Sequence, residues 1–312
     1  MTLPAPRLSV ALSLLLWLTA ASGLAGAAEP LILTEIAPGV FVHQGPHEEA
    51  TPENLGGFAN VGCIVGEDAV AVIDSGGGAA HGRLLREAIA RVTDKPLRYL
   101  ILTHMHPDHS LGAAAFTDSG AVVVGHHKLP RALAARGAHY IAALEDLIGD
   151  AAAGTEAVEP SLLVEDRLSL DLGGRVLELT AWPTAHSDND LTVFDPASST
   201  LWAGDLLFMQ RIPAVDGSLK GWLEVMEGLR QIPAARVVPG HGPATAAWPA
   251  ALADQERYLT TLLSEIRAMI AAGGTMEQAV ARVGQAERGR WQLFERYHAR
   301  NIVTGFAELE WE

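Results

Sequence analysis

Short apolar runs recur along the chain and are separated by glycine, proline and charged residues. In the stretch "ANVGCIVGEDAVAVIDSGGG", residues 59–78, two apolar runs flank a turn at residues 66–68, and this pattern predicts a β-hairpin. The next segment differs, because Leu84, Leu85 and Ile89 recur with a period near 3.6 residues. That period predicts a helix over residues 82–92.

The alternation of strand-like and helix-like segments continues along the rest of the chain. Further strands are expected at residues 31–45, 97–103, 121–126, 168–172, 175–183, 190–195, 200–205 and 236–242. Further helices are expected at residues 128–150, 219–231 and from about 248 onward, with a break at 273–274. Many short strands with helices between and after them indicate two packed sheets with helices outside, which is a layered α/β domain.

The N-terminal segment has a different pattern. Residues 1–28 carry one charged side chain, Arg7, followed by the apolar run "LSVALSLLLWLTAASGLAGAA", which ends in small residues around Ala27. This pattern predicts a secretory signal peptide, residues 1–27, and a mature domain over residues 28–312 in the periplasm or outside the cell. The alternative is an uncleaved membrane anchor. Its apolar core of about fifteen residues is shorter than the ~20 that span a bilayer, so we expect no stable membrane insertion after cleavage.

Composition narrows the function classes. The chain has 22 basic and 37 acidic residues and a formal net charge of −15, which argues against a nucleic-acid partner and favours a small-molecule substrate. Hydrophobic residues make up 49% of the 312 positions, enough for a sizeable core. Cys63 is the single cysteine, so no intrachain disulfide can form, and its apolar surroundings predict a buried, inert thiol rather than a catalytic one.

The candidate chemistry begins in "ILTHMHPDHSLG", residues 101–112, directly after an apolar strand. His104 and His106 are two positions apart, so on an extended strand both side chains would point to one metal ion. Proline resists continuing a strand, so the chain is expected to turn there and carry Asp108 and His109 to a second point nearby. Imidazole and carboxylate are the groups that zinc prefers where sulfur is absent.

Four residues cannot complete two metal sites, so further ligands are expected downstream. His186, Asp205 and His241 each follow an apolar strand and are expected to enter a loop at one rim of the fold. Taken singly, each has an ordinary alternative: a surface or capped histidine, or a turn aspartate. Beside the histidine-rich stretch they fit as the missing ligands.

These motifs together resemble the metallo-β-lactamase-fold hydrolases. "THMHPDHSLG" is similar to the T-H-x-H-x-D-H-x-x-G signature of that family, and "VIDSG", "PTAHSDND", "LWAGDLLF" and "VVPGHG" follow in family order between residues 60 and 242. The resemblance implies a four-layer αββα sandwich with a binuclear metal site at one edge. His104, His106 and His186 would bind the first zinc, Asp108, His109 and His241 the second, and Asp205 would bridge both. Asp74 would hold the histidine-rich loop, or else be a plain turn residue.

Asp205 narrows the class further. True β-lactamases of this fold have cysteine or serine there, whereas aspartate resembles glyoxalase II, lactonases and sulfatases. "GDLLFMQRIPAVDGSLKGWLEVMEGL" and the tail "WQLFERYHARNIVTGFAELEWE" resemble the exported SoxH-like hydrolases, in particular the quinoprotein relay system zinc metallohydrolases. That group implies a functional link to a periplasmic quinoprotein dehydrogenase.

The expected function is a periplasmic di-zinc hydrolase of thioesters, esters or lactones. Two zinc ions would lower the pKa of a shared water toward ~7, and Asp108 and Asp205 would orient the resulting hydroxide. The alternatives are a mono-iron persulfide dioxygenase, a β-lactamase activity and a non-catalytic accessory protein. Phe208, Met209 and Arg211 are expected near the pocket mouth, where Arg211 would pair with a substrate carboxylate or be an ordinary surface residue.

Overall fold

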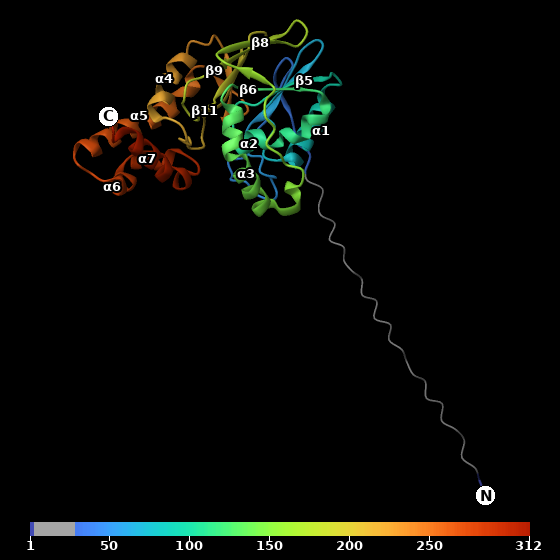
Figure 1. Cartoon of the computed structure of the whole chain (residues 1–312), viewed down its shortest axis with the longest axis horizontal. Coiled ribbons are helices and arrows are strands. Elements are labelled where there is room, and N and C mark those ends of the chain that lie inside the picture. The colour runs from blue at the N-terminus through green and yellow to red at the C-terminus, as the bar shows by residue number, and fades with distance from the viewer. Residues whose placement is uncertain (3–28) are drawn as a thin grey trace.

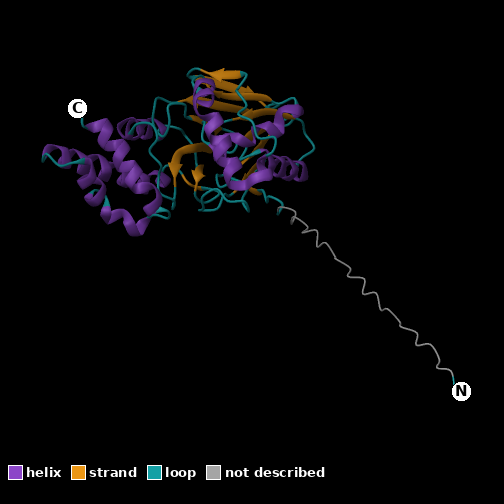
Figure 2. Cartoon of the chain, turned by 60° about the horizontal axis from the view of Figure 1, so that its bottom comes forward, coloured by secondary structure: helices purple, strands orange, loops and turns teal. Residues whose placement is uncertain are grey.

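The computed structural model describes residues 1–2 and 29–312, so the predicted signal peptide lies outside the described residues apart from Met1 and Thr2. Two sheets lie face to face at the centre, and helices cover the outer face of each (Figure 1 and Figure 2). This is the four-layer αββα sandwich that the resemblance implies.

The first sheet has seven strands in chain order. Its β3–β4 hairpin, in which Val65 lies opposite Val70, is the one expected around residues 66–68, whereas β4 to β7 run parallel. Parallel neighbours need a crossover between them, and helical segments supply all three crossovers. The strands are β1 (Thr34–Ala37), β2 (Val40–His43), β3 (Val61–Val65), β4 (Val70–Ile73), β5 (Leu97–Ile101), β6 (Val122–His126) and β7 (Leu162–Val164).

The second sheet has six strands in the order β13-β12-β11-β10-β9-β8. Two antiparallel hairpins join consecutive strands, β8 with β9 and β10 with β11. β11 and β12 run parallel, so their C-terminal ends meet at one edge. The strands are β8 (Arg167–Asp171), β9 (Val176–Ala181), β10 (Leu191–Asp195), β11 (Thr200–Phe208), β12 (Arg236–His241) and β13 (Ala246–Ala247).

Helices form the two outer layers. The first sheet carries α1 (Ala79–Val92), α2 (Pro107–Ser110), the 3₁₀ segments η1 (Leu111–Ser119) and η2 (Gly149–Ala152), and α3 (Leu129–Ile148). The second sheet carries α4 (Leu219–Leu229), α5 (Ala253–Ala271), α6 (Met276–Arg282), α7 (Phe294–Leu309), η3 (Ala250–Leu252) and η4 (Gln285–Arg290). The expected break at residues 273–274 separates α5 from α6. None of the described helices is both long and apolar enough to cross a membrane.

β4 shows why the central strands are continuously apolar. Val70 and Val72 pack against the helices of the first layer, whereas Ala71 and Ile73 pack between the two sheets. Successive side chains on a strand point to opposite faces, so a strand covered on both faces is apolar at every position. Cys63 is fully buried on the helix side, and burial raises the pKa of its thiol to about 12, which fits the expected inert thiol.

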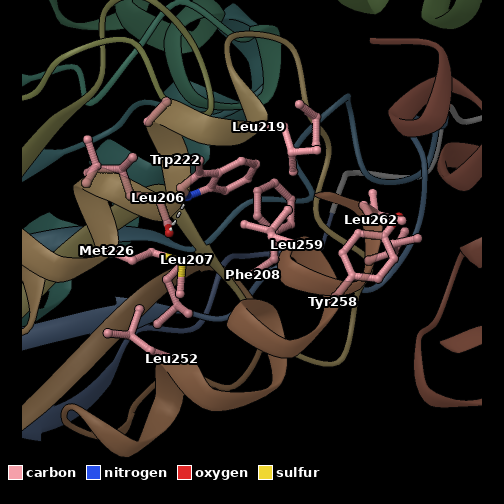
Figure 3. Close-up of a cluster of buried hydrophobic side chains, with 14 of the residues drawn as sticks. Leu206, Leu207, Phe208, Leu219, Trp222, Met226, Leu252, Tyr258, Leu259 and Leu262 are labelled. Carbon is pink, nitrogen blue, oxygen red and sulfur yellow. Dashed lines mark hydrogen bonds between the residues drawn. The ribbon is translucent and has the colours of Figure 1, made fainter. Parts of the chain in front are cut away.

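The largest apolar cluster lies between the second sheet and helices α4, α5 and α7 (Figure 3). Trp222 is fully buried there, and its Nε1 donates a hydrogen bond to the carbonyl of Leu206 at 3.1 Å (Figure 3). Phe208 and Tyr258 are also fully buried in it. This cluster holds the C-terminal end of β11, and with it the edge of the sheet where the candidate ligands lie.

Candidate metal centre

The histidine-rich stretch lies in a loop and a short helix, not on a strand. β5 ends at Ile101, so the expectation that His104 and His106 share a strand is wrong. The strand ends because the Thr103 backbone N–H donates to the Asp74 carboxylate at 2.8 Å instead of to a neighbouring strand. Pro107 then begins α2, which places Asp108 and the next histidine on a helical turn.

The first group of candidate ligands contains the three histidines assigned to the first zinc, together with Asp205. His106 Nδ1 lies 3.0 Å from His104 Nε2 and 2.8 Å from His186 Nε2. Asp205 Oδ2 lies 3.4 Å from His186 Nε2. The four ligand atoms all lie within 4.8 Å of one another, so one metal ion can contact them all.

The second group contains Asp108, His109 and His241. Asp108 Oδ2 lies 3.5 Å from His109 Nε2 and 3.3 Å from His241 Nε2, and these ligand atoms also lie within 4.8 Å of one another. Asp205 Oδ1 lies 3.1 Å from His109 Nε2 and 3.4 Å from His241 Nε2. The two oxygens of Asp205 therefore face different groups, as the expected bridging position requires.

The second sheet supplies the downstream ligands in ways that the sequence only partly indicated. His186 follows β9 in a loop and His241 ends β12, but Asp205 lies inside β11, which continues to Phe208. The expected loop after Asp205 is therefore wrong. Gly240, on the neighbouring strand, makes room for this carboxylate, because a Cβ atom there would lie 2.0 Å from Asp205 Oδ1.

Each of the five histidines turns one ring nitrogen toward the candidate metal centre and has the other ring nitrogen held by a neighbour. Such partners fix the ring orientation of metal-ligating histidines. The partners are Thr103 Oγ1 for His104 (3.0 Å), Asp216 Oδ2 for His106 (3.2 Å), Asp74 Oδ2 for His109 (2.7 Å), the Ala214 carbonyl for His186 (2.7 Å) and the Phe58 carbonyl for His241 (3.3 Å).

Burial and charge set the protonation of these groups. Burial lowers the pKa of His186 to about 3 and that of His104 well below its usual range, so both imidazoles are neutral, which is the form that binds metal. Burial alone would raise the pKa of Asp108, but the neighbouring histidines, His109 foremost, lower it to about 2. Asp205 is likewise ionised, because the opposing effect of burial is outweighed by His241 and His109.

The donor set fits divalent metal. Asp108 Oδ2, His109 Nε2 and Asp205 Oδ1 are buried and have no hydrogen-bond partner among the described residues. Buried polar atoms without partners are costly in a folded protein, and a metal ion would satisfy all three. The structure thus brings all seven candidate ligands together, and their role as ligands stays a prediction.

Five of the seven candidate ligands, all except His104 and His109, line a pocket of about 650 Å³. Of the residues expected near its mouth, Phe208 and Arg211 line it and Met209 packs against the apolar cluster. Arg211 is no surface residue, because it is 3% exposed. Its guanidinium already contacts the Glu48 carbonyl, Glu49 and Tyr297. Arg211 is therefore not free to pair with a substrate carboxylate, which was the other expectation.

Sequence reasoning missed four residues that shape this pocket: Asp216, Arg136, Tyr297 and Arg300. Asp216 follows β11 in "PAVDGS", which reads as a plain turn. Arg136 is exposed on α3 and Arg300 is exposed on α7, whereas Tyr297 is half-buried on α7. Arginine and tyrosine are ordinary residues at such helix positions. No periodic pattern distinguishes them, because only the folded chain brings residues so far apart in sequence to one pocket.

Comparison with known proteins agrees with this geometry. A family model described as "Metallo-beta-lactamase superfamily" matches residues 55–241, which contain all seven candidate ligands. The chain belongs to the metallo-beta-lactamase superfamily. Members of this superfamily typically bind metal.

Individual relatives are distant. The "Beta-lactamase-like protein 2 homolog" of Caenorhabditis elegans is 22% identical over 157 residues, which is 50% of this chain and 46% of that protein, so the match spans under half of the relative. A metallo-beta-lactamase from Pontibacter korlensis superposes with a TM-score of 0.58 at 20% identity, covering 74% of this chain and 99% of that one. The sec-alkylsulfatase Pisa1 from Pseudomonas sp. gives a TM-score of 0.69 at 17% identity, covering 89% and 50%. At these identities the solved structures show the shared fold.

Proposed function

We propose that this superfamily member is an exported hydrolase that holds two zinc ions and cleaves a small thioester, ester or lactone. The observation that carries the proposal is the pair of adjoining ligand groups that share Asp205 in a pocket of about 650 Å³. A pocket of this size suits a small-molecule substrate.

The chain's own residues supply positioning and a dry environment. Bound divalent metal would bring a water of lowered pKa and an electrophilic contact for the substrate carbonyl. Asp108 and Asp205, ionised and lining the pocket, orient the attacking water by accepting its hydrogen bonds. Phe58 and Phe208 form an apolar part of the pocket wall and exclude bulk water from the reacting groups.

The second ligand group favours two metal ions over the mono-iron dioxygenase alternative. A mononuclear site would need only the first group, His104, His106 and His186 with Asp205. Asp108 Oδ2 and His109 Nε2 would then stay buried without partners. Occupation of both groups satisfies these atoms, and nitrogen and oxygen donors suit zinc.

The finer placement among SoxH-like, quinoprotein relay hydrolases is part of the same proposal. It rests on the sequence resemblance around the bridging aspartate and in the C-terminal tail. The accompanying expectation is that the protein acts together with a periplasmic quinoprotein dehydrogenase.

The decisive experiment combines metal analysis with a substrate panel. We expect about two zinc ions per chain and hydrolysis of at least one thioester, ester or lactone. Asp205→Asn should lose metal and hydrolysis together, because it weakens both ligand groups. Asp146→Asn is the matched control, since Asp146 is exposed on α3 and distant in sequence from every ligand.

Two outcomes would overturn the proposal. One iron per chain with oxygen consumption on a persulfide would support the dioxygenase instead. Full biological function of Asp205→Asn after loss of metal would support a non-catalytic accessory. Nitrocefin in the same panel measures any β-lactamase activity.

Export has its own test. N-terminal sequencing of the protein recovered from the periplasm or medium should begin at Ala28, as expected for removal of residues 1–27. Recovery of the intact N-terminus in the membrane fraction would instead support the anchor.

A further inference from the structure

The pocket contains a compact charge cluster that the proposed hydrolysis does not use. Arg136 on α3 and Arg300 on α7 both line the pocket, and each donates a hydrogen bond of 2.6 Å to the Asp216 carboxylate. Two guanidinium groups share one carboxylate here. The cluster therefore keeps one net positive charge.

Both arginines have donors left over. Their side chains are 46% and 56% exposed, whereas Asp216 is 11% exposed beneath them. Arg136 uses Nη1 and Arg300 uses Nη2 toward Asp216, and the Tyr140 hydroxyl is a further hydrogen-bonding neighbour of Arg136. A guanidinium carries five N–H donors, so both arginines keep donors for a ligand. Arg211 differs, because its guanidinium already contacts Glu49, Tyr297 and a backbone carbonyl.

The cluster also lies next to the candidate metal centre. Asp216 Oδ2 lies 3.2 Å from Nε2 of His106, one of the first group of ligands. A group bound by the two arginines is therefore close to a substrate carbonyl at that centre. Because Asp216 holds both guanidinium forks in place, little side-chain freedom is lost when they take a ligand.

We propose that Arg136 and Arg300 bind an oxyanionic group of the substrate, so that the substrate is a small thioester, ester or lactone that also carries a carboxylate, sulfate or phosphate. This inference rests on the proposed function for the scissile bond but on its own residues for the anion. The competing interpretation is that the two ion pairs only fasten α3 to α7.

A binding experiment tests the receptor without any turnover. Calorimetry on the zinc-loaded protein compares N-methylglutaramic acid with its uncharged analogue N,N′-dimethylglutaramide. Wild type and Arg131→Gln should bind the acid about ten- to a hundred-fold more tightly, the range for a hydrogen bond to a charged group. Arg131 is the matched control, an exposed arginine on α3 that does not line the pocket.

The variants Arg136→Gln and Arg300→Gln should each lose most of this preference for the acid. Propanesulfonate and propylphosphonate, measured in the same way, distinguish a sulfate or phosphate receptor from a carboxylate receptor. The proposal is wrong if wild type shows no preference for the charged ligands, or if both variants keep it.

A hydrolysis arm separates this inference from the proposed function. The substrates are the p-nitrophenyl esters of glutaric acid with its second carboxyl group either free or converted to a methylamide. The variants should lower kcat/KM for the acid ester about ten-fold or more relative to kcat/KM for the neutral ester. If no ester or thioester is cleaved but the calorimetric preference exists and depends on the arginines, the hydrolase proposal fails and the anion receptor stands. A variant counts as folded if its metal content and melting temperature equal those of wild type. If glutamine disturbs the fold, Arg136→Lys and Arg300→Lys replace the glutamine variants. These lysine variants keep the charge and should retain part of the preference for the acid.

Discussion

At the scale of single residues, Asp216 connects two parts of the pocket. Its carboxylate contacts the outward nitrogen of His106 and both arginines. These neighbours lower its pKa well below the usual range against the opposing effect of burial. An ionised carboxylate behind an imidazole fixes the ring and makes it a better metal ligand.

Asp216→Asn is therefore expected to weaken metal binding by about ten- to a hundred-fold. The substitution keeps the shape of the side chain and removes the charge that holds His106. Competition with a chromophoric chelator measures the affinity, with Asp146→Asn as control. Unchanged affinity would mean that the contact with His106 is incidental.

His81 is a buried titratable residue outside the metal centre. Its ring fits between two glycines, because a Cβ at Gly57 or Gly76 would lie 2.1 Å or 1.8 Å from it. Burial, with a smaller contribution from His43, lowers the pKa of His81 to about 4. The folded protein therefore holds His81 neutral, whereas the unfolded chain takes up a proton below about pH 6.5.

His81 should thus contribute stability that is present above pH 6.5 and is lost as the pH falls toward 4. From pH 7.5 to 5 the loss is about 2 kcal/mol in the free energy of unfolding. Urea unfolding at both pH values, in the same metal buffer, should show a drop smaller by about that amount in His81→Gln. An identical drop in the variant would contradict the assignment.

At the scale of elements, the strands and helices could largely be predicted, and the ligand loops could not. β4 is apolar at every position and β11 is buried at every position because both faces of each strand are covered, and the hairpins follow from glycine and proline turns. The end of β5 and the length of β11 depend on contacts across the fold. Asp74 takes the Thr103 N–H, and β12 continues to pair with β11 beyond Asp205.

The close packing of β11 and β12 at Asp205 gives a sharp prediction. Gly240→Ala should displace the Asp205 carboxylate, because the added methyl group would lie 2.0 Å from its Oδ1 and 2.7 Å from the Gly204 carbonyl carbon. We expect loss of bound metal and of hydrolysis, measured by metal analysis and the substrate panel. Gly289→Ala is the control, since no heavy atom lies within 4 Å of its added Cβ, and it should behave like wild type.

At the scale of the whole molecule, α7 holds the pocket wall against the second sheet. Asn301 accepts a hydrogen bond from the Val215 N–H at 2.9 Å and donates to the Pro213 carbonyl at 2.7 Å. Glu308 accepts a hydrogen bond from the Leu219 N–H at the start of α4 at 2.7 Å. These contacts order the segment that carries Asp216.

Asn301→Ala should lower the free energy of unfolding by about 2–4 kcal/mol, because it leaves buried backbone groups of Val215 and Pro213 without partners. Chemical denaturation measures the change. Asn54→Ala, in a half-buried surface turn, has only local backbone and side-chain partners and should cost less. Equal losses in the two variants would show that burial of Asn301 adds nothing.

The convergence of the seven candidate ligands could be predicted, because each residue type stands at or near a strand end where loops gather. The pocket wall could not be predicted, because Arg136 on α3 and Arg300 on α7 come together only at the Asp216 carboxylate. The local sequence pattern therefore indicates where the ligands lie. The residues of the pocket wall can be identified only in the folded chain.

The structure divides the pocket between separate parts of the chain. The candidate ligands come from strand ends, the loops beyond them and the short helix α2, whereas α3 and α7 supply pocket wall and no candidate ligand. Mutations in these two helices can therefore alter which molecule is accepted while the residues that perform the reaction stay as they are. Descendants of such a protein that accept different substrates would then differ in sequence in α3 and α7, and they would share the ligand residues in the loops.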